Sequence, residues 1–440
     1  MPELKIDLEQ DNFVCQYIDT FHTKAGGYSE FRHAAAVTLL GIATDRRIRM
    51  ELSFGTVIPN IWTLFLGESS IAGKSTVYDE ARDILTRADM GTAMANEFSK
   101  EAIPQALAAE PHRYIFNPEV SGLLAGIHKT NGHLAGLQDD LSFLYDNPDR
   151  YTKQLTKAEY EAYNIFINAL CCTTPLRFQE NTEPGDLQGG LLTRFLLYCP
   201  QKKPLYVPVT IATHNIEEAV HRIAVQLKQI AEMIARFKTI YMFPSQKALD
   251  AFNQWMQDDL YSDNATGDTE STLIGRLRTY VFKLSIIYYI GSEAFLKDAE
   301  KVYNTCLQGN LTFSRPSKNT EVFQAEMSIP DVYFFEAMKH VRGYFLPTSS
   351  TALDEATEYN TQNNLQKILR LLKRAPRQRL TRSQLMQKIS GRITAKELNE
   401  LVDLCEDEGI VMREYDNSTD ARGRQKHTEI IVLLENGGSI

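Results

Sequence analysis

The feature that most constrains the fold is a glycine-rich turn set between an apolar run and a helix-like run. Residues 61–66 (IWTLFL) are apolar, the turn GESSIAGKST follows at 67–76, and KSTVYDEARDILTRA has the periodicity of a helix. A strand, a glycine-rich turn and a helix in this order form the setting of a phosphate-binding loop, because the N–H groups of the turn and the positive end of the helix favour an anion. The sequence therefore predicts a nucleotide site at this turn.

The spacing within the turn differs from the usual phosphate-loop pattern, which places four residues between a first glycine and Gly-Lys. Five residues separate Gly67 from Gly73, and Glu68 occupies the regular position. A lysine in a solvated turn is common, so the Gly-Lys-Ser-Thr ending alone is also compatible with a turn that binds nothing. The apolar run directly before the turn favours the nucleotide site.

A working loop assigns a role to each residue that follows Gly73. Lys74 is expected to reach the β- and γ-phosphates of ATP, and Ser75 is expected to place its hydroxyl on Mg²⁺. Thr76 lies in the first turn of the helix and is expected near the α-phosphate. ATP and Mg²⁺ are therefore the predicted ligands.

A second block, YIFNPEV, places an acidic residue after another apolar run. Glu119 is expected to polarise the attacking water, and the residue before it is commonly an aspartate that orients the metal-bound water. Pro118 occupies that position here, so Asn117 is the candidate metal ligand, through its amide oxygen. The alternative for Glu119 is a carboxylate at a helix N-terminus beside Pro118.

Two further blocks supply a polar residue and a cation. In NALCCTTP, Thr173 or Thr174 is expected to hold the attacking water or the γ-phosphate, although either is also typical of a loop before Pro175. In QGGLLTRFL, Arg194 follows Gly-Gly and is expected to neutralise the charge that develops in phosphoryl transfer, in the same chain or across a subunit boundary. The alternative for Arg194 is a surface arginine that begins a strand.

Short apolar runs alternate with spacers of helical length, which predicts an α/β fold with a parallel-sheet core of the P-loop NTPase kind. The predicted strands are RIRMEL, IWTLFL, YIF, IFINALCC and RFLLYC, and residues 10–45 are predicted to be helical. The segments Glu217–Phe237 and Gln246–Ala294 have a helical pattern without a strand signal. The predicted regions are N-terminal helices (1–55), an ATPase core (56–200), a helical subdomain (201–346), a polar linker (347–361) and a winged helix (362–440).

The C-terminal region predicts a DNA-binding domain. Three amphipathic helices, a helix stop at Gly409 and two strand-like runs around a basic loop indicate a winged helix. Ten Lys and Arg and no acid fall within residues 362–396, although the net charge of the chain is −9, and such a stretch binds phosphate backbones through counterion release. The residues expected to contact nucleic acid are Arg374, Arg377, Arg379, Arg382, Lys388, Arg422, Arg424 and Lys426.

Two alternatives remain for this region. A basic helical surface is often merely solvated. The predicted third helix is acidic, with Glu397, Glu400, Asp403, Glu406 and Asp407, whereas a base-reading helix meets phosphates first. We therefore expect backbone contact to DNA with little sequence specificity, or a protein-docking role for the acidic face.

Four blocks in a fixed order carry a resemblance to a known family: PNIWTLFLGESSIAGKST, FNPEVSGLLAG, INALCCTTP and LQGGLLTRFLLY. From about Phe13 to about Val341 the chain resembles a group of P-loop ATPases found in phages, plasmids and other mobile elements. Members of this group often follow a primase domain and are catalogued as a domain of unknown function. They look like replicative helicases of the ring-forming AAA+ or superfamily-3 kind.

The resemblance implies roles for individual residues. Because loop lengths ahead of Gly-Lys-Ser vary in this family, Gly67, Ser69 and Ser70 are expected to complete the turn before Gly73. Pro118 departs from the family's usual Asp-Glu pair and puts the metal geometry and the catalytic rate in question. The residues assigned to hydrolysis are Lys74, Ser75, Glu119, Thr173 or Thr174 as sensor, Arg194 as finger and Arg276 as second sensor.

The resemblance also implies an activity. The expected protein is a DNA-stimulated ATPase that forms a homo-oligomeric ring, with a hexamer as the expected size. It would translocate on single-stranded or forked DNA and unwind it during replication of a mobile element. The alternative is an ATP-controlled DNA-binding switch, such as an initiator or a transposition or defence regulator, in which hydrolysis is slow.

The composition is that of a globular protein of the cytoplasm. The chain is 43% hydrophobic and 23% charged, and none of its apolar runs approaches the roughly 20 residues of a membrane span. Its six cysteines form neither a Cys-x-x-Cys pair nor a framework spacing, which is typical of a reducing compartment. No membrane partner is expected.

Overall fold

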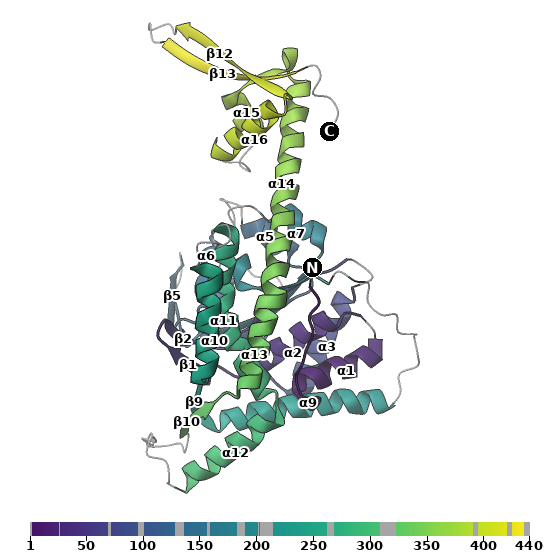
Figure 1. Ribbon diagram of the computed structural model, residues 1–440, viewed down its shortest axis with the longest axis vertical. Coiled ribbons are helices and arrows are strands. Elements are labelled where there is room, and N and C mark those ends of the chain that lie inside the picture. The colour runs from purple at the N-terminus through teal and green to yellow at the C-terminus, as the bar shows by residue number, and fades with distance from the viewer. Residues whose placement is uncertain are drawn as a thin grey trace. The chain divides into compact units, whose positions relative to one another are not determined.

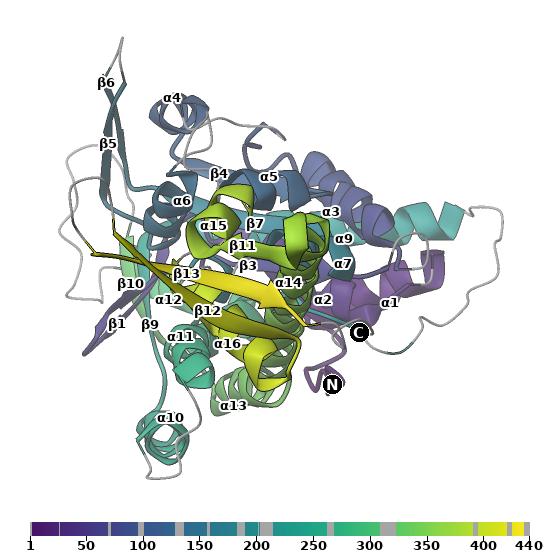
Figure 2. The same ribbon diagram turned by 90° about the horizontal axis from the view of Figure 1, so that it is seen from above.

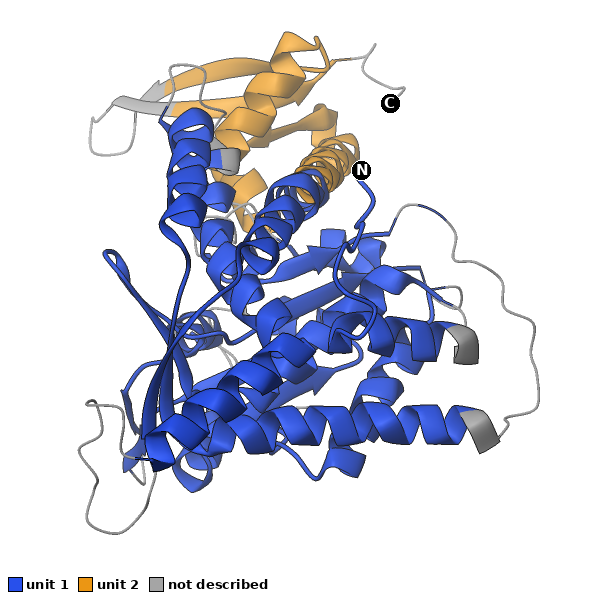
Figure 3. Cartoon of the chain, turned by 60° about the horizontal axis from the view of Figure 1, so that its bottom comes forward, with its two compact units in different colours: residues 1–353 blue, residues 354–440 orange. Residues whose placement is uncertain are grey.

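A computed structural model provides the structure of the 440-residue chain. By its internal contacts the chain divides into two compact units, residues 1–353 and 354–440 (Figure 3). The residues that the structure describes are 2–25, 27–68, 72–95, 101–127, 136–155, 159–182, 190–200, 202, 214–261, 268–308, 323–389, 395–419 and 425–434.

A parallel sheet lies at the centre of the first unit, and its strands follow the order β4-β7-β3-β8; Figure 2 labels β4, β7 and β3 of this sheet. All three neighbouring pairs in this order run parallel. The strands predicted from apolar runs at these positions are confirmed, and so is the α/β class with a parallel sheet. The strand bounds are β4 (His112–Asn117), β7 (Phe166–Thr173), β3 (Trp62–Leu66) and β8 (Leu196–Tyr198).

Helices surround this sheet, and α1, α2, α3 and α9 contact one another as one group (Figure 1). The helices predicted within residues 10–45 are confirmed as α1 and α2. None of the helices in the described ranges combines the length and the apolar character that a membrane span requires. The helix bounds are α1 (Phe13–Ala25), α2 (Ser29–Ala43), α3 (Lys74–Ala88), α4 (Ala102–Ala109), α5 (Ser121–Ile127), α6 (Leu137–Tyr145), α7 (Pro175–Asn181), α9 (His214–Ala235), α10 (Gln246–Leu260), α11 (Asp268–Ile290), α12 (Glu293–Leu307) and α13 (Asp331–His340), with a 3₁₀ turn (Leu192–Arg194) and a π-helical segment (Val341–Phe345).

Successive side chains of β3 point to opposite faces of the sheet. Phe65 stacks on Phe31 of α2, with ring centroids 4.6 Å apart. Trp62 packs edge-to-face on Tyr145 of α6, with centroids 5.3 Å apart. Every residue of β3 and β7 is buried, as expected for parallel strands that are covered by helices on both faces.

A second sheet joins segments that are far apart in the sequence, in the order β10-β9-β1-β2. The predicted strand RIRMEL is confirmed as β1. Strands β9 and β10 lie within residues 201–346, where only helices were predicted, so this region also contributes strands. The bounds are β1 (Ile48–Leu52), β2 (Gly55–Val57), β9 (Phe237–Phe243) and β10 (Phe323–Ser328).

An antiparallel hairpin of β5 (Arg150–Gln154) and β6 (Glu159–Tyr163) projects from the first unit as an arm (Figure 2). Its basic residues pair with acids of the same unit. Lys153 Nζ lies 2.6 Å from Asp140 Oδ1, and Arg150 pairs with Glu161 across the hairpin.

The second unit begins within a long helix, α14 (Leu346–Arg374), and the predicted linker (347–361) is helical throughout. The predicted helices and hairpin of this region are confirmed, and the additional strand β11 completes an antiparallel sheet with the order β11-β13-β12. The remaining bounds are a 3₁₀ turn (Pro376–Gln378), β11 (Arg379–Thr381), α15 (Arg382–Ile389), α16 (Ala395–Asp407), β12 (Val411–Thr419) and β13 (Gln425–Leu433).

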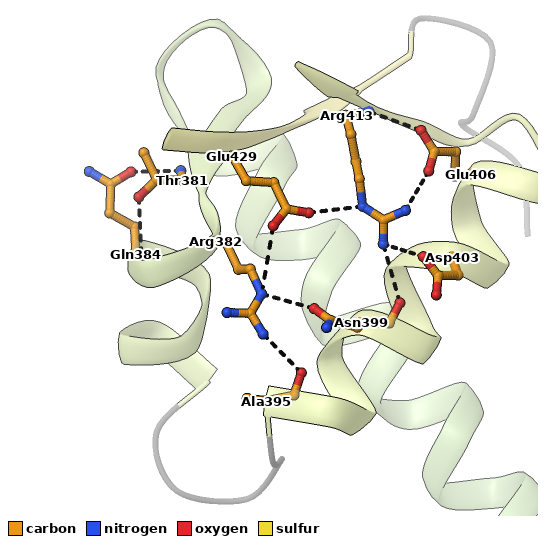
Figure 4. Close-up of polar contacts among 9 residues, drawn as sticks. All are labelled: Thr381, Arg382, Gln384, Ala395, Asn399, Asp403, Glu406, Arg413 and Glu429. Carbon is orange, nitrogen blue, oxygen red and sulfur yellow. Dashed lines mark hydrogen bonds and ion pairs between the residues drawn. The ribbon is translucent and has the colours of Figure 1, made fainter. Parts of the chain in front are cut away.

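The start of α15 shows why the sequence forms a helix there. The N-cap is Thr381, the residue before the first residue of α15 (Figure 4). The hydroxyl oxygen of Thr381 accepts the N–H of Gln384 at 3.2 Å, and Gln384 Oε1 accepts the N–H of Thr381 at 3.0 Å. This reciprocal capping box satisfies two N–H groups that the first helical turn leaves unpaired.

In the first unit, a buried ion pair joins α2 to α3. Arg32 Nε and Nη2 each lie 3.2 Å from a carboxylate oxygen of Glu80, and both side chains are almost fully buried. Removal of two charges from water costs several kcal/mol, so one partner left alone is strongly destabilising. Helix α3 begins at the glycine-rich turn, so this pair also holds that turn against α2.

We predict that Arg32→Met and Glu80→Met each lower the free energy of unfolding by about 3–5 kcal/mol, because each leaves one buried charge without its partner. The double variant should lose less than either single variant. Urea denaturation followed by tryptophan fluorescence measures this in the first unit, since both tryptophans, Trp62 and Trp255, lie there. Losses that simply add in the double variant would contradict the pairing.

Candidate functional site

The segments that follow β3, β4 and β7 meet at one edge of the central sheet, because parallel strands place their carboxyl ends at the same edge. The N–H of Gly67 donates to the carbonyl oxygen of Thr173 at 3.3 Å, which ties the turn after β3 to the end of β7. The N–H of Val120 donates to the carbonyl oxygen of Cys172 at 2.8 Å, which ties the segment after β4 to β7. The structure therefore brings three of the four predicted blocks together.

Lys74 is the first residue of α3, and its ammonium group lies against the strand ends. Lys74 Nζ donates to the carbonyl oxygens of Gly67 at 2.7 Å and of Thr173 at 2.9 Å. Partial burial lowers the pKa of Lys74, although Glu119 nearby favours the charged form. The cation is thus held at the point where the turn, β3 and β7 meet.

Glu119 lies at the same point and is held by hydrogen bonds. Glu119 Oε1 accepts from the hydroxyl of Thr173 at 2.8 Å and from the N–H of Ser121 at 3.2 Å. Burial tends to raise the pKa of Glu119, but the hydrogen bonds from Thr173 and Ser121 outweigh burial and lower it. Glu119 is therefore kept ionised.

Asn117 and Thr174, two other predicted residues, make local contacts near this point. Asn117 Oδ1 accepts the N–H of Glu119 at 3.0 Å, which fixes the turn through Pro118. The Thr174 hydroxyl oxygen accepts the N–H of Arg177 at 3.3 Å and caps α7. Of the two threonines considered as sensor, Thr173 is the one that contacts Glu119.

Arg177 is a residue of this site that the sequence reasoning missed. Its Nη1 donates to the hydroxyl of Ser121 at 3.3 Å and lies 3.7 Å from Glu119 Oε2. Its side chain is 55% exposed. The position of Arg177, just after the TTP turn that follows β7, is the one signal in the sequence that places it at this edge.

The glycine-rich turn is packed closely against α2. A Cβ atom at Gly67 would lie 2.7 Å from the Cβ of Ala72 and 2.9 Å from Cζ of Phe31, so the position accepts only glycine without movement. Gly73 adopts a left-handed conformation (φ 65°), which favours glycine. Close packing therefore favours glycine at position 67, and backbone conformation favours it at position 73.

The remaining turn residues are only partly described. Ser75 and Thr76 are exposed in the first turn of α3. Ser69 and Ser70 lie outside the described residues. The roles assigned to these four residues stay predictions.

Arg194 and Arg276 lie elsewhere. Arg194 precedes β8, which runs parallel to β3, so it sits at the edge of the sheet opposite to Lys74. Arg194 is buried, with Nη1 donating to the carbonyl oxygen of Gly190 at 2.7 Å and Nη2 3.3 Å from Asp146 Oδ2. Arg276 Nη2 lies 3.4 Å from the position of a Cβ at Gly190. Within one chain, neither arginine is brought together with Lys74.

A cavity of about 390 Å³ opens at this opposite edge. The basic side chains that line it at the start of β4 are engaged by the protein. His112 Nδ1 lies 2.6 Å from Asp45 Oδ1, and Arg113 donates to the carbonyl oxygens of Ala93, Ala106 and Glu110. Because these contacts stabilise the fold, we place the candidate nucleotide site at the Lys74 edge, where a cation and a carboxylate meet.

In the second unit, several arginines bind to acids of the same unit (Figure 4). Arg382 Nε donates to Asn399 Oδ1 at 2.8 Å and lies 3.7 Å from Glu429 Oε2. Arg379 Nη2 lies 2.7 Å from Glu414 Oε2. These two arginines, predicted to contact nucleic acid, hold α15 and the start of β11 to their neighbours.

Arg413 of β12 is the centre of the same contacts and was not singled out from the sequence (Figure 4). Its guanidinium contacts Asp403 and Glu406 of α16 and Glu429 of β13. Only 16% of the Arg413 side chain is exposed. Part of the acidic face of α16 is therefore neutralised by the hairpin.

The structure describes only some of the other residues that were predicted to contact nucleic acid. Arg374, Arg377 and Lys388 are exposed. Lys426 pairs through its backbone with Ser418 of β12, and Arg422 and Arg424 lie outside the described residues. Arg374 and Arg377 thus lie at and just after the end of α14, and Lys388 lies on α15.

Comparison of the chain with protein-family models and with curated proteins finds no match.

We predict that Gly67→Ala lowers the free energy of unfolding of the first unit by about 1–3 kcal/mol, because the added methyl group overpacks the contact with Phe31 and Ala72. Gly122→Ala in α5 is the matched control, since no atom lies within 4 Å of its added Cβ. The control should be neutral or stabilising by up to about 1 kcal/mol. Urea denaturation compares the two, and equal effects would contradict the close packing of the turn.

Proposed function

We propose that the chain is a P-loop ATPase whose phosphate site is the turn at residues 67–76. One connected network carries the proposal: Lys74 donates to the carbonyl oxygen of Thr173, and the hydroxyl of Thr173 donates to Glu119. A cation for phosphates and a carboxylate for water thus lie on either side of one strand end. Their position at the carboxyl edge of a parallel sheet supports a nucleotide site, since open α/β sheets bind ligands there.

Each residue of the proposed site has a role in ATP binding or hydrolysis. Lys74 would exchange two neutral carbonyl partners for the β- and γ-phosphates of ATP, because the ammonium group binds an anionic oxygen more strongly than a neutral one. Ser75 offers its hydroxyl to Mg²⁺. Glu119 orients the attacking water, and Thr173 fixes the carboxylate of Glu119.

The residues near Glu119 fit a Mg²⁺ ion held mainly by the nucleotide. Asn117 Oδ1 already accepts one N–H, which leaves one lone pair for a metal-bound water. Pro118 offers no ligand. Mg²⁺ keeps several waters and binds largely through substrate phosphates. The nucleotide would therefore supply most of its ligands other than water, and Ser75 would add a ligand from the protein.

We further propose DNA as the partner of the second unit, through a basic stripe formed by Arg370, Lys373, Arg374 and Arg377. Arg370, Lys373 and Arg374 are exposed and follow the i, i+3, i+4 spacing of one face of α14, and Arg377 is exposed in the turn that follows the helix. The arginines bound by acids, Arg379 and Arg382, are left out of this contact. A stripe of this kind binds phosphate backbones without reading the sequence.

Our main proposal is a motor: a homo-oligomeric ring that hydrolyses ATP while it translocates on DNA. The family resemblance of the four sequence blocks supports it. A specific observation favours the alternative, an ATP-controlled DNA-binding switch with slow hydrolysis. The carboxylate of Glu119 is engaged by Thr173 and Ser121, and Pro118 stands where a metal-orienting acid is common.

We predict ATP hydrolysis that rises with single-stranded DNA and falls at least about 100-fold in both Lys74→Ala and Glu119→Gln, because each variant removes a charged group from the reacting centre. Phosphate release, with and without DNA, is the measurement. Wild-type turnover that is slow and indifferent to DNA, with ATP-dependent assembly kept in Glu119→Gln, would replace the motor by the switch. Unchanged hydrolysis and assembly in Lys74→Ala would contradict the phosphate loop.

We predict that replacement of Lys373, Arg374 and Arg377 by Gln weakens single-stranded DNA binding and lowers the slope of log K against log salt by about 2, since each phosphate contact contributes roughly 0.7. The matched control replaces three exposed lysines of the first unit, Lys247, Lys297 and Lys301. Fluorescence anisotropy over a salt series measures both. An equal change in the control would show that net charge, and not the stripe, determines binding.

A further inference from the structure

Arg177 is a second cation at the candidate phosphate site. It lies beside Glu119, whereas Lys74 lies against the carbonyl oxygens of Gly67 and Thr173. Thr173 lies between them: its carbonyl oxygen accepts from Lys74 and its hydroxyl donates to Glu119. Arg177 Nη1 reaches Glu119 Oε2 at 3.7 Å and the hydroxyl of Ser121 at 3.3 Å. Lys74, Glu119 and Arg177 therefore belong to one network across the ends of β3, β4 and β7.

The two carboxylate oxygens of Glu119 have different neighbours in this network. Oε1 accepts from Thr173 and Ser121, and Oε2 faces the guanidinium of Arg177. A cation this close to Oε2 favours the ionised form of Glu119 and so weakens it as a base for water, although the Glu119 side chain is 39% exposed. Movement of Arg177 away from Oε2 would remove this effect.

Arg177 is able to move. Its side chain is 55% exposed, and the 3.7 Å separation from Glu119 is longer than a hydrogen bond. The guanidinium group forms planar, paired hydrogen bonds with phosphate more readily than the ammonium group of lysine does. A terminal phosphate held by Lys74 would therefore compete with Glu119 for Arg177.

We propose that Arg177 is a positioning residue that responds to the terminal phosphate: it pairs with Glu119 when that phosphate is absent and turns to the phosphate when ATP binds, which frees Glu119 Oε2 for the attacking water. The proposal rests on the ATP site proposed above. It assigns the discrimination of ATP from ADP to Arg177, and not to Arg194. Arg177 acts on the reaction through Glu119 as well as through the phosphate.

A purely structural role makes a different prediction. If Arg177 only ties the segment after β4 to α7 through Ser121, its loss affects ATP and ADP equally and follows the loss of stability. A role in phosphate sensing affects ATP binding and leaves ADP binding unchanged. The ratio of the two affinities separates these readings even where a variant is less stable.

The test measures the affinities for ATP and ADP, with kcat and KM for ATP, in the full-length wild type, Arg177→Lys and Arg177→Gln. We expect Arg177→Gln to keep its ADP affinity, to bind ATP about tenfold more weakly, as for one lost charge-assisted hydrogen bond, and to lose about 100-fold in kcat. Arg177→Lys should recover most of the ATP affinity but only part of kcat. Arg82→Gln, at an exposed arginine of α3, is the matched control and should leave all four quantities unchanged.

Lys74→Ala in the same series separates the two proposals. If Lys74→Ala abolishes ATP binding while Arg177→Gln keeps both the ATP-over-ADP preference and kcat, the inference about Arg177 is overturned and the ATP site stands. A rise of kcat in Arg177→Gln at unchanged ATP affinity also overturns it. If Lys74→Ala binds ATP as the wild type does, the ATP site itself fails.

Discussion

The parallel pairing of β3 with β7 is the constraint on which the candidate site depends. It places the carboxyl ends of the two strands side by side, with Leu66 opposite Thr173. The turn that leaves β3 is then held by Thr173, whose carbonyl oxygen accepts both the N–H of Gly67 and the ammonium group of Lys74. Because β4 lies on the other side of β7, Glu119 reaches the hydroxyl of the same threonine. One residue at a strand end thus connects the three segments.

The N-terminal helices support this arrangement from one face of the sheet. Phe31 packs on β3 and closes the space beside Gly67, and Arg32 binds Glu80 of α3 in the buried interior. The buried ion pair is stable only as a pair, so it couples the position of α2 to that of the helix that carries Lys74. The second unit uses arginines in a similar way, because Arg413 holds α16 to the hairpin (Figure 4).

Much of the fold follows from local patterns. The runs that became β3, β4, β7 and β8 are short and apolar, and the glycine-rich turn marks the start of α3, so the sequence sufficed for the parallel sheet. β9 was not predicted although its sequence FKTIYMF is largely apolar and aromatic, and β10 was not predicted because FQAEMS contains few apolar residues. Their pairing depends on contacts between segments far apart in the chain. The polar composition of 347–361 suggested a linker, but Ala352, Leu353 and Ala356 bury one side of α14, so packing stabilises a helix there.

Residues of the candidate site that belong to a sequence motif could be predicted, whereas residues that reach it only through tertiary structure could not. Lys74, Glu119 and Thr173 meet as their blocks suggested. Arg177 carries no motif and joins them only through the folded position of α7, whereas Arg194 lies at the opposite edge because it precedes its strand. The partners of Arg379 and Arg382 in the second unit are likewise set by tertiary contacts, so a basic run in the sequence overstates the number of cations available to DNA.

The most direct test of this account is an experimental structure of the protein with Mg²⁺ and a non-hydrolysable ATP analogue. We expect the triphosphate to lie on the turn at 67–76, with the γ-phosphate within hydrogen-bond distance of Lys74 Nζ and with that ammonium group withdrawn from the carbonyl oxygen of Thr173. A triphosphate bound at the other edge of the sheet, beside Asp45 and His112, with Lys74 still on its two carbonyl oxygens, would contradict it.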